Sequence, residues 1–206
     1  MESIQRTKFN VSILGESQVG KTSMISVKSG LQFNEKQIAT VGIDNFIDKK
    51  VIDNKEYKFK FFDTAGQERY NSISAQTIKI ADGFILVFSV TDRGSLEKIS
   101  FWMKSIEENT NIKDKVIILV GNKIDMEREI SHEEANNFAK ENNLKYFETS
   151  AKTGYGIDET FNQLYQDIYE LNKKDNPENE KNKNIQLENT NNDEPNEKGK
   201  KKSKCC

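Results

Sequence analysis

Six short apolar runs in the first 150 residues have the length and composition of β-strands. They are rich in Val, Ile, Phe and Tyr, and polar stretches and turn-forming residues separate them. The runs cover residues 9–15, 46–52, 57–63, 83–90, 115–121 and 145–150. Residues 83–90 and 115–121 are apolar on both faces, which is typical of strands buried inside a parallel sheet.

Four other segments carry apolar residues at helical spacing, at about residues 21–30, 94–109, 132–142 and 157–171. Ser131, with Glu134 three residues later, has the pattern of a helix N-cap. Asp53, Asn54 and Lys55, between two strand-like runs, predict a hairpin turn. The pattern therefore predicts an α/β fold, with a mostly parallel six-stranded sheet, helices on both faces and one antiparallel hairpin.

The composition changes sharply near residue 172. Residues 172–206 contain no aromatic side chain, and both prolines of the chain, Pro177 and Pro195, lie there among Asn, Lys and Glu. Such a segment buries too little apolar surface to offset the entropy lost on ordering. We therefore expect a folded domain at residues 1–171, followed by a disordered tail.

The overall charge argues against a nucleic-acid binder that works through a broad basic face, because 31 Lys and Arg stand against 33 Asp and Glu. No apolar run approaches the ~20 residues that cross a bilayer, and the N-terminus lacks the apolar region of a secretory signal. The two cysteines are adjacent at the end of the chain, so we expect no disulfide framework and a cytosolic setting. His132, the only histidine, is expected at the surface, with no cluster of partners for a metal site or a catalytic triad.

The sequence GESQVGKT at residues 15–22 matches the P-loop pattern in full, and it follows a predicted strand and opens a predicted helix. Gly15 and Gly20 allow the backbone to wrap closely, so that N–H groups and the helix N-terminus face a phosphate. Lys21 is expected to reach the β and γ oxygens of a nucleotide, and Thr22 to supply one oxygen ligand to Mg²⁺.

The sequence VIILVGNKID ends a buried strand in Asn122, Lys123 and Asp125. The Asp125 carboxylate is placed to accept two hydrogens, from N1–H and from the exocyclic amino group of guanine. Adenine offers no such pair at that edge, and a buried group left unpaired discriminates strongly between ligands. These residues therefore predict guanine rather than adenine.

With GESQVGKT, DTAGQE and GNKID in this order, and ETSAK at residues 148–152, the chain resembles the Ras-superfamily small GTPases over residues 7–171. The resemblance implies a set of nucleotide-binding residues, with Ala151 contacting the guanine O6, Lys123 and Lys152 flanking the base, and Phe33 packing against it. The implied set is Gly15, Glu16, Ser17, Gln18, Val19, Gly20, Lys21, Thr22, Ser23, Phe33, Thr40, Asp63, Gly66, Asn122, Lys123, Asp125, Ser150, Ala151 and Lys152.

The same resemblance implies hydrolysis of GTP to GDP and phosphate. Gln67 would orient the attacking water, Gly66 would bind the γ-phosphate through its N–H, and Asp63 would hold Mg²⁺, usually through water. Thr40 would close on Mg²⁺ and the γ-phosphate. The implied catalytic set is Lys21, Thr40, Gly66 and Gln67, and the implied metal ligands are Thr22, Thr40 and Asp63.

Loss of the γ-phosphate should relax two segments, at about residues 33–45 and 64–78, which gives a nucleotide-controlled switch. No arginine stands where an internal finger would act. We therefore expect slow intrinsic turnover, which an activating protein would raise by about 10³–10⁵-fold.

Among the branches of the superfamily, the Rab group resembles this chain best, through TVGID, DTAGQERY and the terminal Cys-Cys. Three departures alter the aromatic surface that Rab partners read: Asn45 replaces the usual Phe, Phe62 replaces the usual Trp, and QTIKIADG replaces a more aromatic segment. The resemblance implies a monomeric G domain that regulates vesicle traffic. It also implies an exchange factor, a GTPase-activating protein, effectors, a Rab escort protein and a GDP-dissociation inhibitor as partners.

The C-terminal sequence KGKKKSKCC predicts a membrane anchor. In Rabs such a terminal pair, here Cys205 and Cys206, receives two geranylgeranyl groups, each buried CH₂ contributing about 0.8 kcal/mol. Five lysines before the pair would each add roughly 1 kcal/mol near an anionic leaflet. The expected location is the cytoplasmic face of an intracellular membrane or of the plasma membrane, with a cytosolic pool.

Three alternatives remain open. The chain could be a Ras-like signalling GTPase, or a nucleotide-locked binding module with little turnover; the presence of Thr40, Asp63 and Gln67 favours a cycling enzyme over the latter. A P-loop kinase or ATPase would bind ATP, and this reading does not account for Asn122 and Asp125.

Overall fold

The computed structural model describes residues 6–35, 43–64 and 71–174, with the backbone alone at residues 43, 44, 64 and 71–74. The strands are β1 (Lys8–Leu14), β2 (Ile43–Ile52), β3 (Lys55–Thr64), β4 (Gly83–Ser89), β5 (Val116–Asn122) and β6 (Lys145–Glu148). The helices are α1 (Lys21–Lys28), α2 (Asn71–Ile80), α3 (Arg93–Glu97), α4 (Ile99–Asn109), α5 (His132–Glu141) and α6 (Ile157–Lys174), with a 3-10 helix at Ile112–Asp114.

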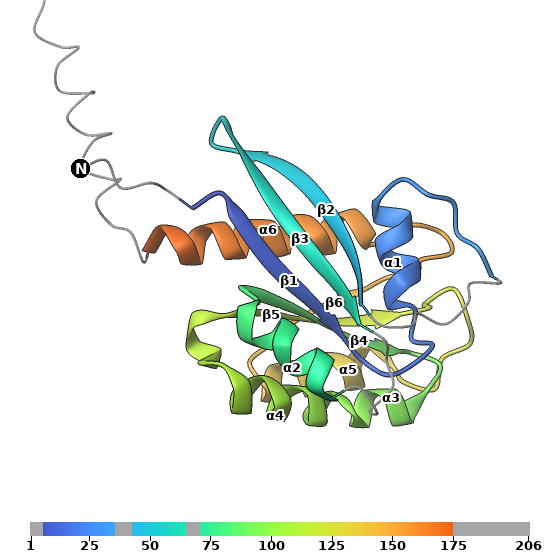
Figure 1. Cartoon of the computed structure of the whole chain (residues 1–206). Helices are drawn as coiled ribbons and strands as arrows, with labels where there is room; N and C mark the ends of the chain where they lie inside the picture. The colour runs from blue at the N-terminus through green and yellow to red at the C-terminus, as the bar shows by residue number, and fades with distance from the viewer. Residues whose placement is uncertain (1–5, 36–42, 65–70, 175–206) are drawn as a thin grey trace, which may run out of the picture.

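The six strands form one sheet in the order β2-β3-β1-β4-β5-β6. Strand β2 runs antiparallel to β3, and every other neighbouring pair is parallel. Helices cover both faces of the sheet (Figure 1). The predicted fold class and its single hairpin are therefore confirmed.

The two faces of the sheet build two separate cores, because side chains alternate along each strand. In β4, Ile85 and Val87 pack into a cluster with α1 and α6, whereas Phe84, Leu86 and Phe88 pack into a second cluster with α2, α3, α4 and α5. Every residue of β4 is buried, as its uniformly apolar sequence predicts.

The hairpin turn and the helix cap follow their sequence signals. Asp53 and Asn54 have positive φ angles of 48° and 60°, the conformation that a two-residue hairpin turn requires. Ser131 caps α5, because its side chain accepts a hydrogen bond from the Glu134 N–H at 3.1 Å.

The helices differ from the prediction in three places. Helix α2 lies where no helix is predicted, because its Ser, Thr and Ile residues are modest helix formers. Tertiary packing stabilises it instead. For instance, the hydroxyl groups of buried Thr77 and of Ser12 in β1 are hydrogen-bonded at 3.2 Å. The single helix predicted at 94–109 is divided at Lys98 into α3 and α4. Helix α6 continues to Lys174, so the first three residues assigned to the tail are helical. The disorder predicted for the tail falls on residues outside the described ranges from 175 onward.

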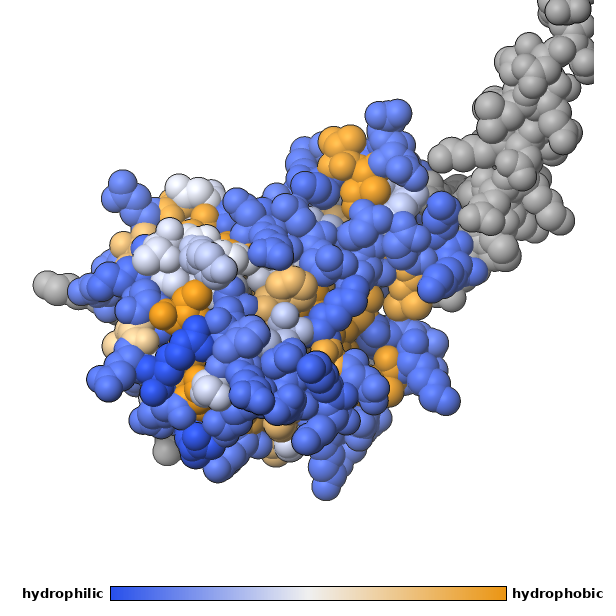
Figure 2. Space-filling model, turned by 180° about the vertical axis from the view of Figure 1, so that it is seen from behind, coloured by the Kyte–Doolittle hydropathy of each residue, from blue (hydrophilic) through white to orange (hydrophobic). Residues whose placement is uncertain are grey.

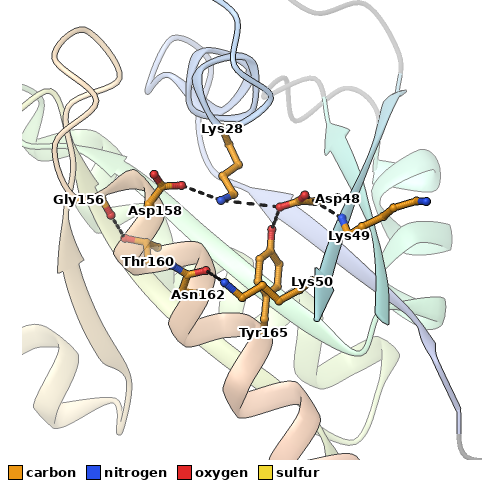
Figure 3. Close-up of polar contacts among 9 residues, drawn as sticks. All are labelled: Lys28, Asp48, Lys49, Lys50, Gly156, Asp158, Thr160, Asn162 and Tyr165. Atoms are coloured by element: carbon orange, nitrogen blue, oxygen red, sulfur yellow. Dashed lines mark hydrogen bonds and ion pairs between the residues drawn. The ribbon is translucent and has the colours of Figure 1, made fainter. Parts of the chain in front are cut away.

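A polar cluster fixes α6 against both α1 and β2 (Figure 3). Lys28, at the end of α1, pairs with Asp158 of α6 at 2.7 Å and with Asp48 of β2 at 3.8 Å. The Tyr165 hydroxyl of α6 donates to the same Asp48 at 2.6 Å, and burial, followed by this bond, raises the pKa of Tyr165. These contacts, together with the aromatic core beneath, hold the C-terminal helix to the sheet.

The surface is largely hydrophilic. On the face seen in Figure 2, hydrophobic side chains form separate patches within a hydrophilic surround. Within the described ranges, no helix has the length and apolar character needed to cross a bilayer.

Candidate functional site

The loop after β1 has the backbone geometry that its glycines predict. Gly15 has a φ of +147°, and a Cβ there would lie 2.1 Å from the Val87 carbonyl oxygen. Gly20 has a φ of +98°, and its Cβ would lie 2.3 Å from the Asn122 side-chain nitrogen. Gly20 offers no side-chain cap to α1, so the N–H groups and the positive end of the helix dipole face this loop. The backbone of this loop therefore has the geometry that suits an anion.

Lys21 lies inside this loop and is only 5% exposed. Its Nζ donates to the carbonyl oxygens of Gly15 and Glu16, at 2.8 Å each. Burial lowers the pKa of Lys21 to about 8, although the carboxylates of Asp63 and Glu16 act in the opposite direction. The ammonium is thus held where a phosphate on the loop would contact it.

Two side-chain oxygens that could ligate a metal ion meet at the start of α1. The Thr22 hydroxyl donates to Asp63 Oδ2 at 2.5 Å, and Asp63, near the end of β3, is 2% exposed. A hydroxyl and a carboxylate are oxygen ligands of the kind that Mg²⁺ prefers, and Mg²⁺ commonly takes only one or two protein ligands beside a nucleotide. The residues present therefore fit this ion.

Asn122, at the end of β5, connects the loop to a second segment of the site. It is 1% exposed, and its Nδ2 donates to the Val19 carbonyl oxygen at 2.8 Å. Its Oδ1 accepts from the Ala151 N–H at 3.2 Å and from the Thr149 hydroxyl at 3.1 Å. One amide side chain thereby fixes the P-loop and residues 149–151 together.

Asp125 is held by the same segment. The Ser150 hydroxyl donates to Asp125 Oδ1 at 2.6 Å and accepts from the Thr153 N–H at 3.1 Å. Asp125 itself is exposed, and Lys123 has a left-handed φ of 68° that turns the chain between Asn122 and Asp125. The carboxylate is therefore oriented by a buried neighbour while it remains accessible to a ligand.

Two further predicted residues lie beside this region. Lys152 pairs with Glu35 at 3.0 Å, although both side chains are more than half exposed, so the pair contributes little to stability. Phe33 is half-buried and packs against the core between α1 and α6, the same cluster that includes Ala151.

The structure brings together the described members of the predicted set. The P-loop, Asp63, Asn122 to Asp125, and Ser150 to Lys152 follow or end β1, β3, β5 and β6, whose carboxyl ends meet at one edge of the sheet. Thr40, Gly66 and Gln67 lie outside the described residues, and so do Cys205 and Cys206.

Sequence reasoning missed Thr149, which is fully buried and completes the hydrogen bonds of Asn122. Its place inside ETSAK is the only signal that points to it. A motif marks which segment matters, but the hydrogen-bond partner of a given hydroxyl depends on the fold.

The two replaced aromatic positions lie next to each other. Asn45 of β2 is the register partner of Phe62 of β3. Phe62 is only 7% exposed, and the Lys60 Nζ lies 4.8 Å from its ring centroid, at cation–π distance. The effect of these two residues on partner recognition stays a prediction.

Comparisons with known proteins agree with this geometry. The model of the Ras family matches residues 10–170. Ras-related protein Rab-13 of Mesocricetus auratus is 43% identical over 162 residues, covering 78% of this chain and 79% of that protein. Ras-related protein Rab-11B of Dictyostelium discoideum is 36% identical over 159 residues, covering 76% and 72%. GTP-binding protein ypt3 of Schizosaccharomyces pombe is 35% identical over 165 residues, covering 79% and 77%. The chain belongs to the Ras family and is a divergent Rab-like small GTPase.

Proposed function

We propose that this protein cycles between a GTP-bound active state and a GDP-bound inactive state, and recruits effectors in intracellular membrane traffic. The observation that carries the proposal is the hydrogen bonding of Asn122, which joins a P-loop to the segment that orients Asp125. These bonds support the proposal, because they hold the P-loop and the Asp125 carboxylate at one edge of the sheet.

The guanine base would be read by Asp125 and Ala151. The Asp125 carboxylate would accept hydrogen bonds from N1–H and from the exocyclic amino group. The Ser150 hydroxyl, which also donates to this carboxylate, would keep it in place. Adenine would leave that carboxylate facing an unprotonated ring nitrogen, which is the kind of mismatch that discriminates strongly.

The phosphates would be bound by the P-loop N–H groups and by Lys21, which exchanges its carbonyl partners for phosphate oxygens. Thr22 and Asp63 would hold Mg²⁺, which would supply positive charge against the phosphates. Gln67 orients the attacking water, and Thr40 and Gly66 contact the γ-phosphate, as the family motifs imply. Phosphoryl transfer requires mainly such positioning and charge stabilisation.

The place of action would be a membrane surface. The paired Cys205 and Cys206 would receive two geranylgeranyl groups after an escort protein presents the chain, and the preceding lysines would favour an anionic leaflet. Mass spectrometry of the C-terminal peptide from the native source tests this step. A peptide that ends in unmodified cysteines would overturn it.

Binding and single-turnover assays test the proposed reaction. The purified chain should bind GDP and GTP far more tightly than ADP and ATP, and should hydrolyse bound GTP slowly alone and faster with an activating protein. Gln67→Leu should retain binding and lose activated hydrolysis. Tight guanine binding without hydrolysis, with or without activating proteins, would instead support the nucleotide-locked module.

A further inference from the structure

A second group of polar contacts lies beside the base-reading residues but outside them, around Glu148 at the end of β6. Arg128 donates to Glu148 through two parallel bonds, of 2.6 and 2.7 Å. Tyr146 donates its hydroxyl to Glu148 Oε1 at 2.9 Å, and His132 Nδ1 lies 3.1 Å from the same oxygen. We name these four residues the Glu148 cluster. His132 is 66% exposed, as expected.

The Glu148 cluster is packed against the end of β5. The Tyr146 hydroxyl lies so close to Gly121 that a Cβ at Gly121 would be 2.6 Å from it. The Tyr146 ring also stacks on Phe88 with centroids 6.2 Å apart. Gly121 is followed directly by Asn122, so the cluster is in contact with the strand that carries the hydrogen-bonding centre of the site.

The cluster also joins the two base-reading segments. Arg128 lies three residues after Asp125, and Glu148 lies two residues before Ser150. The segments are already bonded through Ser150 to Asp125, at the exposed end of the site. A backbone bond from the Ile124 N–H to the Thr149 carbonyl oxygen, at 3.3 Å, also joins them. The Arg128 to Glu148 pair adds a side-chain connection, and Glu148 is only 15% exposed.

We propose that Glu148, held by Arg128 and Tyr146, is a positioning residue that fixes the spacing between the Asp125 and Ser150 segments and thereby slows release of guanine nucleotide. This inference rests on the proposed function, because it takes Asp125 as the group that reads the base. Glu148 would not touch the nucleotide.

The chemistry of the cluster suits a fixed spacer. A planar guanidinium that binds both carboxylate oxygens restricts distance and angle together, which a single bond does not. The bonds from Arg128, opposed by desolvation and aided by Tyr146 and His132, lower the pKa of Glu148 to about 2. The carboxylate is therefore charged across the physiological range.

The test compares dissociation of GDP and of inosine diphosphate from the full chain, with fluorescent analogues of both. Inosine diphosphate lacks the exocyclic amino group that would donate a hydrogen bond to Asp125. The ratio of the two dissociation rates therefore measures how well Asp125 is placed. The variants are Glu148→Gln, Arg128→Lys and Tyr146→Phe. Glu134→Gln is the matched control, since Glu134 also receives an arginine fork, from Arg93, at the start of α5.

Glu148→Gln should release GDP roughly tenfold faster, the factor that one charge-assisted hydrogen bond can supply. In this variant, the ratio of the dissociation rate of inosine diphosphate to that of GDP should fall towards one, because a misplaced Asp125 no longer discriminates between the two bases. Arg128→Lys, which keeps the charge without the fork, and Tyr146→Phe should each show a smaller effect of the same kind. Glu134→Gln should match the parent protein.

Three outcomes would overturn the inference. GDP release could be unchanged in Glu148→Gln; it could accelerate with an unchanged ratio, which indicates general destabilisation; or Glu134→Gln could show the same change. A parent chain that binds ADP as tightly as GDP would instead contradict the proposed function itself.

Discussion

The two ends of the site are held in different ways. At the phosphate end, charged and polar side chains contact groups of the same end: Lys21 donates to the carbonyls of its own loop, and Thr22 donates to Asp63. At the base end, the Asn122 amide contacts both the Val19 carbonyl oxygen of the P-loop and the Ala151 N–H, and the Ser150 hydroxyl donates to Asp125. We therefore expect the phosphate end to bind a ligand through groups that exchange hydrogen-bond partners, and the base end to bind it through groups that the protein already holds in place.

This difference predicts that affinity depends mainly on the first end and selectivity on the second. Charge-assisted bonds to phosphate are strong but are the same for every nucleotide. Hydrogen bonds to a base edge contribute less in total but differ between bases.

The largest effect is expected for Lys21→Met, which removes the buried ammonium. Affinity for GDP should fall roughly 1,000-fold, about 4 kcal/mol, because at least one charge-assisted contact and the neutralisation of phosphate charge are lost. Titration calorimetry measures it. The affinities for xanthosine and inosine diphosphates should fall by the same factor. A changed preference among the bases would contradict the division of roles between the phosphate end and the base end.

A smaller effect, opposite in kind, is expected for Asp125→Asn. GDP binding should weaken on the order of 100-fold, because the amide donates where guanine also donates. Xanthosine diphosphate, which carries a carbonyl at that position, should bind better to the variant than to the parent. Competition binding with both nucleotides checks this, and equal weakening of both would show that Asp125 does not read the base.

The pH dependence of binding should reflect the phosphate end. The pKa of Lys21 is lowered to about 8 in the protein, and bound phosphate would raise it again by favouring the ammonium. Binding therefore takes up a proton above pH 8, and GDP affinity should fall by up to about tenfold per pH unit there. Affinity measured from about pH 7 to pH 9 tests this, with Lys21→Arg as a variant whose charge does not titrate.

The smallest effect concerns acid stability at the base end. The pKa of Glu148 is lowered to about 2, so its stabilising contribution is complete above the usual carboxyl pKa, near 4.3, and is lost as the pH falls towards 2. Glu148→Gln should melt a few degrees below the parent at about pH 6, and the gap should narrow below about pH 4. Calorimetric melting across this range measures it; a constant gap would mean that the charge of Glu148 contributes nothing.

The sequence predicts the phosphate end better than the supports of the base end. Gly15, Gly20, Lys21 and Thr22 lie within one continuous motif, so their spacing alone identifies them. Arg128 and Glu148 meet only because β5 and β6 are neighbours in the sheet, and no spacing encodes that pairing.

The same reasoning explains the differences in secondary structure. Helix α2 is held by tertiary contacts such as Thr77 with Ser12, and its own residues carry a weak helical signal. The strands, in contrast, follow from composition alone, because β4 and β5 are buried on both faces. The hydrolytic residues Thr40, Gly66 and Gln67 remain predictions.

The absence of a Cβ at Gly20 limits which residues this position can accept. Gly20 has a φ of +98°, so an alanine there would be strained even with more space, and its Cβ would also lie 2.3 Å from the Asn122 nitrogen. Any side chain at position 20 would therefore displace the amide that joins both ends of the site.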